Sequence, residues 1–245
     1  MELFNAPDLE HDAWYDYATE WMEIIQRLWT DDEPVSYSGK FLTIQNARLR
    51  PRPIQQPHPA IMNAGGSPVG QRWAARHSDM MFTSAPAGDY AAIKQKVAGI
   101  RSLAQEYGRN VQVWLTSSVI CRPTEREAQE YADYVAIEKG DFDAVARLRG
   151  LPNLIEELGQ LSPEEARERK RALVLGSFNM QPLIGTPEQI VHRVRAIADA
   201  GIDGLNLTFV NYDDELQRWI SDVLPLLEEA GLRRPFSSNP GGTIG

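Results

Sequence analysis

The sequence is poor in cysteine, in basic residues and in long apolar runs. Cys121 is the single cysteine among 245 residues, so no internal disulfide can form, and its place in the apolar run from Val113 predicts a buried strand residue. Lysine and arginine number 25 against 34 aspartates and glutamates, and the net charge of −9 argues against a nucleic acid partner. No apolar run approaches the ~20 residues that a membrane helix needs. Because residues 1–5 also lack a secretory signal pattern, we expect a cytoplasmic protein with no membrane partner.

Common catalytic motifs are missing as well. The 4 histidines and the one cysteine are dispersed without metal-ligand spacing, so we expect no metal site. A Gly-x-Ser-x-Gly elbow and a Walker phosphate loop are both absent, which removes the common hydrolase and nucleoside-triphosphatase interpretations. His11, just ahead of a helical pattern, is a candidate general base, with an ordinary surface position as the alternative. The basic cluster Arg167–Arg171 lies in a Glu-rich helical pattern and predicts a solvated face with i,i+4 ion pairs.

Alternating strand and helix patterns fill most of the chain. A long helical pattern comes first, and short alternating runs around Ser38-Gly39 then predict a β-hairpin. Strand candidates afterwards alternate with helix candidates, which is typical of a parallel sheet with crossover helices. The strand candidates are residues 60–63, 80–84, 111–121 and 205–210, and the helix candidates are residues 9–29, 68–77, 88–107, 124–138, 187–200 and 214–230.

A mostly helical insertion over residues 124–175 precedes the last strand candidate. Ser162-Pro163 and Thr186-Pro187 are helix starts, each with a capping hydroxyl and a proline at the first helical position. About four parallel strands emerge, whereas a closed (β/α)8 TIM barrel needs eight. The pattern therefore predicts an α/β fold of the TIM-barrel type with only the C-terminal half of the barrel, formed by residues 1–236 and followed by a disordered tail at 237–245. Open sheet edges would favour self-association into a homo-oligomer.

The loop Asn63-Ala64-Gly65-Gly66-Ser67 has the composition of an anion site. It joins a strand candidate to a helix candidate, and backbone N–H groups at a helix N-terminus can bind phosphate. Gly65 and Gly66 have no Cβ to hold a ligand away, and Ser67 can cap the helix or donate its hydroxyl to a phosphate oxygen. The alternative is an ordinary strand-to-helix loop with a serine cap and no ligand.

The chain contains, in this order, the segments His11–Trp21, Leu28–Trp29, Gly39–Phe41, Pro51–Gln55, Asn63–Pro68, Gly185–Glu188 and Ala200–Asp203. Together these segments resemble the bacterial luciferase-like, flavin-dependent monooxygenases, most of all the alkanesulfonate, alkane and pyrimidine monooxygenase branches. The resemblance runs from about residue 11 to residue 232 and is to the C-terminal portion of a family member. It implies a TIM barrel that uses reduced FMN, supplied by a separate flavin reductase, to activate O2 and oxygenate a small organic substrate.

The resemblance also implies a cofactor site. In the family, the Tyr of a His-Asp-x-x-Tyr segment and the Ser of an Ala-Gly-x-Ser segment contact the FMN phosphate, which implies these roles for Tyr15 and Ser67. The Ala64–Gly66 segment would bring the backbone close to the phosphate. Trp14 stands where the family usually has arginine, so a guanidinium that could pair with phosphate is missing. For His11, a position beside the flavin is a second functional interpretation, next to that of a general base.

Two other functions stay open at this point. A noncatalytic barrel remnant would keep the fold, bind flavin weakly or not at all, and act through protein association. A deazaflavin-dependent oxidoreductase would use the same barrel and a similar phosphate cradle. Phe178–Met180, after the helical insertion, could line a lid over the substrate or simply end a barrel strand. No motif identifies the substrate.

Overall fold

The computed structural model describes residues 9–176 and 180–235, which form two compact units. The first unit contains residues 9–82 and 98–113, and the second contains residues 83–97, 114–176 and 180–235. The expected tail at 237–245 lies outside the described residues, as do Phe178 and Asn179 of the possible lid.

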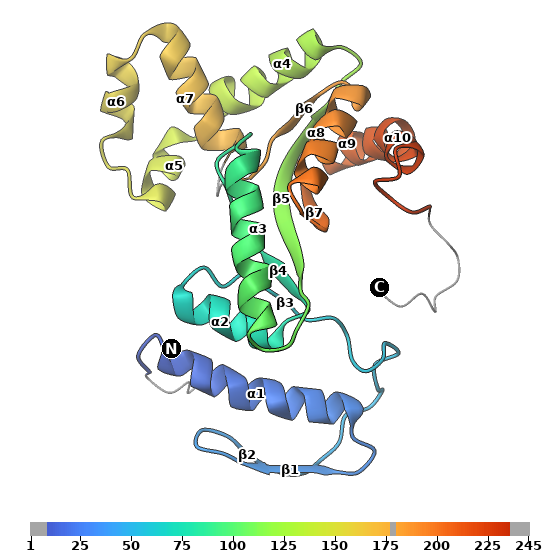
Figure 1. The fold of residues 1–245 in the computed structure, drawn as a ribbon. Helices are drawn as coiled ribbons and strands as arrows, with labels where there is room; N and C mark the ends of the chain where they lie inside the picture. The colour runs from blue at the N-terminus through green and yellow to red at the C-terminus, as the bar shows by residue number, and fades with distance from the viewer. Residues whose placement is uncertain (1–8, 177–179, 236–245) are drawn as a thin grey trace. The chain divides into compact units, whose positions relative to one another are not determined.

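In the first unit, α1 lies between a β-hairpin and α2 (Figure 1). Met22 and Ile24 are the buried residues of α1, whose amphipathic pattern thereby provides an apolar face for packing. The hairpin strands pair antiparallel with Ser38 opposite Thr43, as the turn at Ser38-Gly39 predicts. Two short strands, one before and one after α2 in the sequence, pair in parallel, with Met62 opposite Met80. The elements are α1 (Ala13–Thr30), β1 (Val35–Ser38), β2 (Thr43–Ala47), β3 (Met62–Asn63), α2 (Pro68–His77), β4 (Met80–Phe82), the second half of α3 (Tyr90–Gln105) and the start of β5 (Gln112–Cys121).

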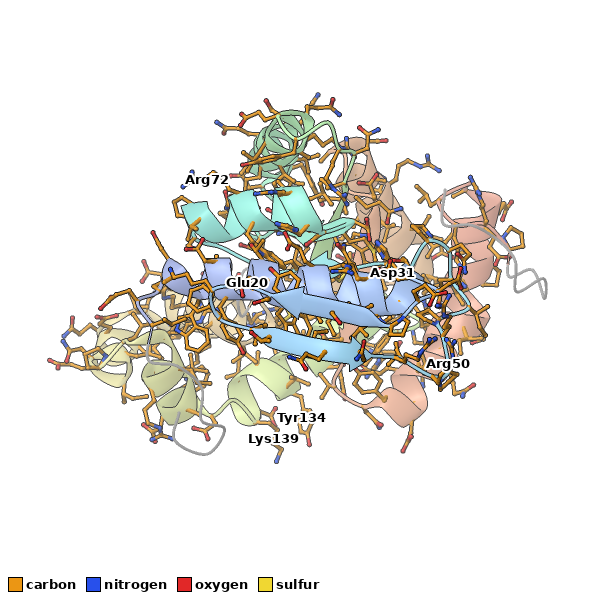
Figure 2. All side chains as sticks on the ribbon, turned by 90° about the horizontal axis from the view of Figure 1, so that it is seen from below. Glu20, Asp31, Arg50, Arg72, Tyr134 and Lys139 are labelled. Carbon is orange, nitrogen blue, oxygen red and sulfur yellow. The ribbon has the colours of Figure 1, made fainter. Side chains whose placement is uncertain are left out.

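The side chain of Glu20, on α1, is hydrogen-bonded to the turn of the hairpin. Glu20, which Figure 2 labels, accepts hydrogen bonds with its carboxylate from the backbone N–H groups of Lys40, Phe41 and Leu42 at 2.7, 2.9 and 3.0 Å. Burial by itself would raise the pKa of Glu20, but these bonds favour the charged form and hold the pKa below its ordinary value of 4.5. The hairpin therefore depends on a charged side chain of the helix.

Acid should loosen this attachment. Because the pKa of Glu20 is lower in the folded protein than in the unfolded chain, its contribution to stability is complete above the unfolded-state pKa. It is lost as the pH falls through the folded-state pKa. We expect Glu20→Gln to lower the thermal unfolding midpoint at neutral pH, and the difference from wild type to shrink on acidification. A difference that stays constant from neutral pH down to about pH 3 would show that the charge of Glu20 does not matter.

In the second unit, a parallel sheet is accompanied by helices (Figure 1). β5 lies between β6 and β7, with Val119 opposite Leu183 on one side and Phe209 on the other. The elements are the first half of α3, most of β5, α4 (Glu125–Asp133), a π-helical turn (Tyr134–Glu138), α5 (Phe142–Arg149), α6 (Leu154–Gln160), α7 (Pro163–Leu175), β6 (Leu183–Gly185), α8 (Pro187–Asp199), β7 (Gly204–Phe209), α9 (Tyr212–Arg218), a second π-helical turn (Trp219–Val223) and α10 (Leu224–Glu229).

The described residues contain 5 parallel strands, one more than the sequence indicates. The additional strand is β6, which has 3 residues, all of them buried. A fully buried run of this length has neither the alternation nor the extent that marks a strand in a sequence. The helical insertion consequently precedes the last two strands, β6 and β7.

Two arginines of the insertion bind a partner on another helix. Arg167 Nε lies 3.1 Å from Asp133 Oδ2, and Arg171 Nη1 lies 3.1 Å from Asp133 Oδ1. Asp133 belongs to α4, whereas both arginines belong to α7. The expected pairing within one helix is therefore wrong for these two residues, because the shared carboxylate comes from a segment that sequence spacing cannot place beside them.

Candidate functional site

The start of α2 is a capped helix N-terminus. Ser67 is the N-cap, and its Oγ accepts a hydrogen bond of 3.2 Å from the backbone N–H of Gly70. Pro68 occupies the first helical position, as the sequence predicts. Since the Ser67 hydroxyl accepts in this bond, its own proton is available for another acceptor. The cap and a phosphate contact are thus compatible with each other.

Asn63 shapes the loop in front of the helix. Its Oδ1 accepts a hydrogen bond of 2.6 Å from the backbone N–H of Gly65. A Cβ on Gly65 would lie 2.9 Å from that oxygen and 2.9 Å from the carbonyl carbon of Gly70, so no side chain fits there. A Cβ on Gly66 would meet nothing within 4 Å, and both Gly66 and Ala64 are exposed. The loop is therefore closed on the Gly65 side and open on the Gly66 side.

Backbone donors are left over at this opening. In the described part of the chain, the N–H groups of Gly66, Ser67 and Val69 donate no hydrogen bond to another residue. Unpaired N–H groups at the first turn of a helix, together with the helix dipole, favour an anion. The opening thus offers hydrogen-bond donors to a negatively charged group.

Helix α1 brings a second hydroxyl to the start of α2. A Cβ on Gly70 would lie 2.4 Å from the Tyr15 hydroxyl oxygen and 3.1 Å from Ser67 Oγ. The two hydroxyls therefore flank the same glycine, although they come from α1 and from the cap of α2. The start of α2 therefore has two hydroxyl donors beside Gly70 and N–H groups without an acceptor among the described residues, and this donor set fits a phosphate group.

The structure places Trp14 and His11 at the start of α1 with other partners. The ring of Trp14 packs edge-on against Tyr17 at a centroid distance of 5.7 Å, and the indole is half-buried. His11 is exposed, with Nδ1 2.9 Å from Asp12 Oδ1 and its ring 5.7 Å from the ring of Tyr15. Their assignment to the site stays a prediction.

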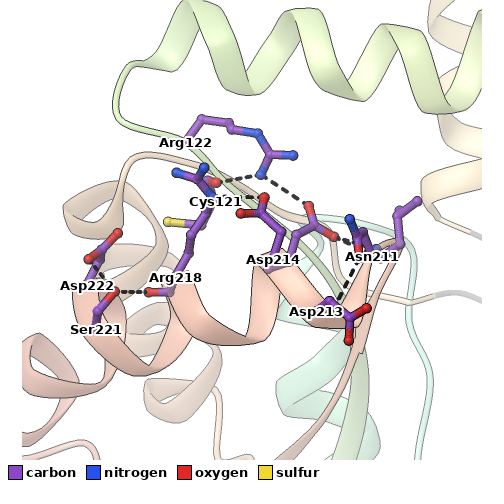
Figure 3. Close-up of polar contacts among 10 residues, drawn as sticks. Cys121, Arg122, Asn211, Asp213, Asp214, Arg218, Ser221 and Asp222 are labelled. Carbon is purple, nitrogen blue, oxygen red and sulfur yellow. Dashed lines mark hydrogen bonds and ion pairs between the residues drawn. The ribbon is translucent and has the colours of Figure 1, made fainter.

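A second polar cluster, formed by Arg122, Glu215 and the backbone at Asn211, lies in the other unit (Figure 3). Glu215 is 1% exposed, and its Oε1 lies 3.1 Å from Arg122 Nη1. Glu215 Oε2 accepts hydrogen bonds from the backbone N–H groups of Val210 and Asn211 at 2.9 and 3.1 Å. The guanidinium of Arg122 lies over the Tyr131 ring, 3.8 Å from its centroid. Because both carboxylate oxygens are occupied, we assign this cluster a structural role.

Cys121 is buried, as the sequence predicts, and burial raises the pKa of its thiol to about 11. The thiol is thus protonated at neutral pH and is a poor nucleophile. Residues 9–176 and 180–235 contain no group of three or more histidine, cysteine, aspartate and glutamate side chains that could hold a metal ion. Every helix of these residues is too short or too polar to span a bilayer.

The sequence matches a known protein family over most of its length. Residues 1–204 match the model of the luciferase-like monooxygenase family. The chain belongs to this family. The resemblance of the sequence segments to luciferase-like monooxygenases is thereby confirmed.

Two curated members of the luciferase-like family are similar over most of the chain. The FMNH2-dependent dimethylsulfone monooxygenase of Pseudomonas putida is 33% identical over 234 residues, which cover 94% of this chain and 62% of that protein. The protein of the same description from Pseudomonas fluorescens (strain Pf0-1) is 30% identical over 226 residues, or 90% of this chain and 60% of that protein. The chain thus spans less than two thirds of the length of these relatives.

A solved structure of a similar protein confirms the fold. The crystal structure of a long-chain alkane monooxygenase superposes with a TM-score of 0.75 and 24% identity, covering 95% of this chain and 60% of that one. The TIM-barrel type of the fold, present as a partial barrel, is therefore confirmed.

Sequence reasoning missed the contributions of Asn63 and Gly70. A signal for Asn63 was available, since a short polar side chain before glycines often bonds to the backbone two residues on. Gly70 had no such signal, because the Tyr15 hydroxyl that occupies its Cβ position comes from a distant part of the sequence.

Proposed function

We propose that this chain binds reduced FMN through its phosphate and serves as a flavin-dependent monooxygenase of small organic compounds. The observation that carries the proposal is the convergence of the Tyr15 and Ser67 hydroxyls on Gly70 at the start of α2. The curated relatives support the choice of cofactor, since both are described as FMNH2-dependent. Their description also makes dimethyl sulfone the first substrate to test.

In this mechanism, the residues of the chain would bind the cofactor phosphate and thereby orient the cofactor. The hydroxyls of Ser67 and Tyr15 would donate to phosphate oxygens, and the N–H groups of Gly66 and Val69 would add backbone donors. The positive end of the α2 dipole favours the phosphate charge. Bound reduced flavin would supply the electrons that activate O2 for transfer of one oxygen atom to the substrate. A flavin reductase would be the partner that provides it.

The FMNH2-dependent relatives favour this function over the noncatalytic remnant and over a deazaflavin-dependent oxidoreductase. The expected cytoplasmic location and homo-oligomeric state stay predictions, as do the domain limits at residues 1 and 236.

Flavin titration tests the proposal. We expect the wild-type protein to quench the fluorescence of added FMN and to bind FMN more tightly than riboflavin, which has no phosphate. Ser67→Ala should weaken FMN binding roughly 10- to 100-fold, because a hydrogen bond to a charged group contributes about 1.5–3 kcal/mol. The affinity for riboflavin should not change.

Ser162→Ala is the matched control for the loss of a cap. Ser162 caps α7 by accepting a hydrogen bond from the backbone N–H of Glu165, as Ser67 does for α2. Both variants should lose about 0.5–2 kcal/mol of stability, but Ser162→Ala should leave the FMN titration unchanged. A wild type that binds no flavin would overturn the proposed function, and an unaltered titration of Ser67→Ala would overturn the assigned site.

A further inference from the structure

A chain of hydrogen bonds connects α2 to the backbone of Tyr15. Trp73 Nε1, on α2, lies 3.0 Å from Thr19 Oγ1, and Thr19 Oγ1 lies 2.8 Å from the carbonyl oxygen of Tyr15. The direction of both bonds is fixed, because an indole N–H only donates and a carbonyl oxygen only accepts. The Thr19 hydroxyl therefore accepts from Trp73 of α2 and donates to the carbonyl oxygen of Tyr15, the residue whose hydroxyl lies beside Gly70.

The indole of Trp73, at one end of these hydrogen bonds, packs against two other rings. The Trp73 ring stacks on His77 at a centroid distance of 5.0 Å and an interplanar angle of 30°. The same ring lies 6.3 Å from the ring of Tyr15. Trp73, Thr19 and Tyr15 are all half-buried, so water competes less for these bonds than at an exposed surface. The link is thus anchored on α2.

The helical environment of Thr19 does not by itself favour threonine at this position. It lies in the interior of α1, where threonine is a poor helix former and where bonding back to the fourth preceding carbonyl slightly destabilises the helix. The second bond, from Trp73, explains the residue: a hydroxyl at this place joins two helices. The hydrogen bond between Thr19 and Trp73 offsets the small loss of helix stability, because it fixes the position of α1 against α2.

We propose that Thr19 and Trp73 are positioning residues which hold the Tyr15 hydroxyl over the start of α2 and thereby give the site its preference for a flavin that carries a phosphate. This inference rests on the proposed function. A donor must lie within about 3 Å of the phosphate oxygen that it serves. The Tyr15 hydroxyl is at the far end of its side chain, so a small rotation of α1 against α2 moves it out of that range while the fold persists.

The experiment compares Thr19→Val with Thr19→Ser. Valine keeps the shape of threonine and removes the hydroxyl, whereas serine keeps the hydroxyl. Both variants and the wild type are titrated with FMN and with riboflavin, and their thermal unfolding midpoints are measured. We expect Thr19→Val to lose roughly 10-fold in FMN affinity, the size of one lost charge-assisted hydrogen bond, with riboflavin affinity unchanged. Thr19→Ser should keep the wild-type ratio of the two affinities.

Trp73→Phe is a second variant, which keeps an aromatic ring beside His77 and removes the N–H donor. It should reduce the FMN-to-riboflavin ratio as Thr19→Val does. A ratio that stays at the wild-type value in Thr19→Val and Trp73→Phe, or a ratio that falls equally in Thr19→Ser, would overturn the inference. Failure of the proposed function gives a different result. In that case the wild-type protein itself shows no preference for FMN over riboflavin, whatever the variants do.

Discussion

Replacing Glu215 by alanine should lower the free energy of unfolding by about 3–5 kcal/mol, as expected when one partner of a buried ion pair is removed. The variant leaves the Arg122 guanidinium, whose side chain is 12% exposed, without its carboxylate. It also leaves the backbone N–H groups of Val210 and Asn211 without an acceptor. Chemical denaturation of wild type and variant, with extrapolation to zero denaturant, measures the difference.

Asp214→Ala is the neighbouring control. Asp214 pairs with Arg218 one turn further along α9 at 3.1 Å, but its side chain is 50% exposed. Exposed pairs of this kind contribute about 0–1 kcal/mol, so the control should be close to wild type. Equal losses for Asp214→Ala and Glu215→Ala would contradict the importance of burial. Glu215→Gln, which keeps the shape and one acceptor oxygen, should fall between the two.

The parts of the fold that the sequence predicts are those with local causes. Ser162 and Thr186 begin α7 and α8 as expected, because a capping hydroxyl and a proline act within one turn of helix. β6 was not predicted, since its 3 buried residues form a strand by pairing with β5. The partners of Arg167 and Arg171 were also missed, because Asp133 reaches them only in the folded structure.

The candidate site also has a part that local sequence predicts and a part that depends on the packing of distant segments. The Asn63–Ser67 loop and its helix start can be recognised from local chemistry, and the structure places them as expected. Tyr15 entered only through the family resemblance, since nothing near it in the sequence indicates a phosphate. The roles proposed for Gly70, Thr19 and Trp73 depend on the packing of α1 against α2, which a single sequence does not reveal.

Gly70→Ala should reduce FMN affinity roughly 100-fold or more, because it would disturb both hydroxyls that we propose as phosphate donors, and a hydrogen bond to a charged group contributes about 1.5–3 kcal/mol. The new Cβ would lie 2.4 Å from the Tyr15 hydroxyl oxygen and 3.1 Å from Ser67 Oγ. Alanine favours a helix over glycine by about 0.5–1 kcal/mol, so helix propensity cannot explain a loss. Titration with FMN and riboflavin measures the effect, and riboflavin affinity should be preserved.

Gly99→Ala is the control for this substitution. Gly99 lies in α3, is exposed, and would place its Cβ in open space, so the variant should bind FMN as wild type does. Normal FMN affinity in Gly70→Ala would show that Tyr15 and Ser67 do not act at this glycine.

Combining Gly70→Ala with Tyr15→Phe separates a shared site from two independent effects. If the alanine Cβ acts by displacing the Tyr15 hydroxyl, removing that hydroxyl in the Gly70→Ala background takes away a contact that is already lost. The double variant should therefore bind FMN about as weakly as Gly70→Ala alone, and Tyr15→Phe should lose roughly 10-fold in the wild-type background. Losses that add fully would mean that Tyr15 and Gly70 affect flavin binding separately, which a common contact with one phosphate does not allow.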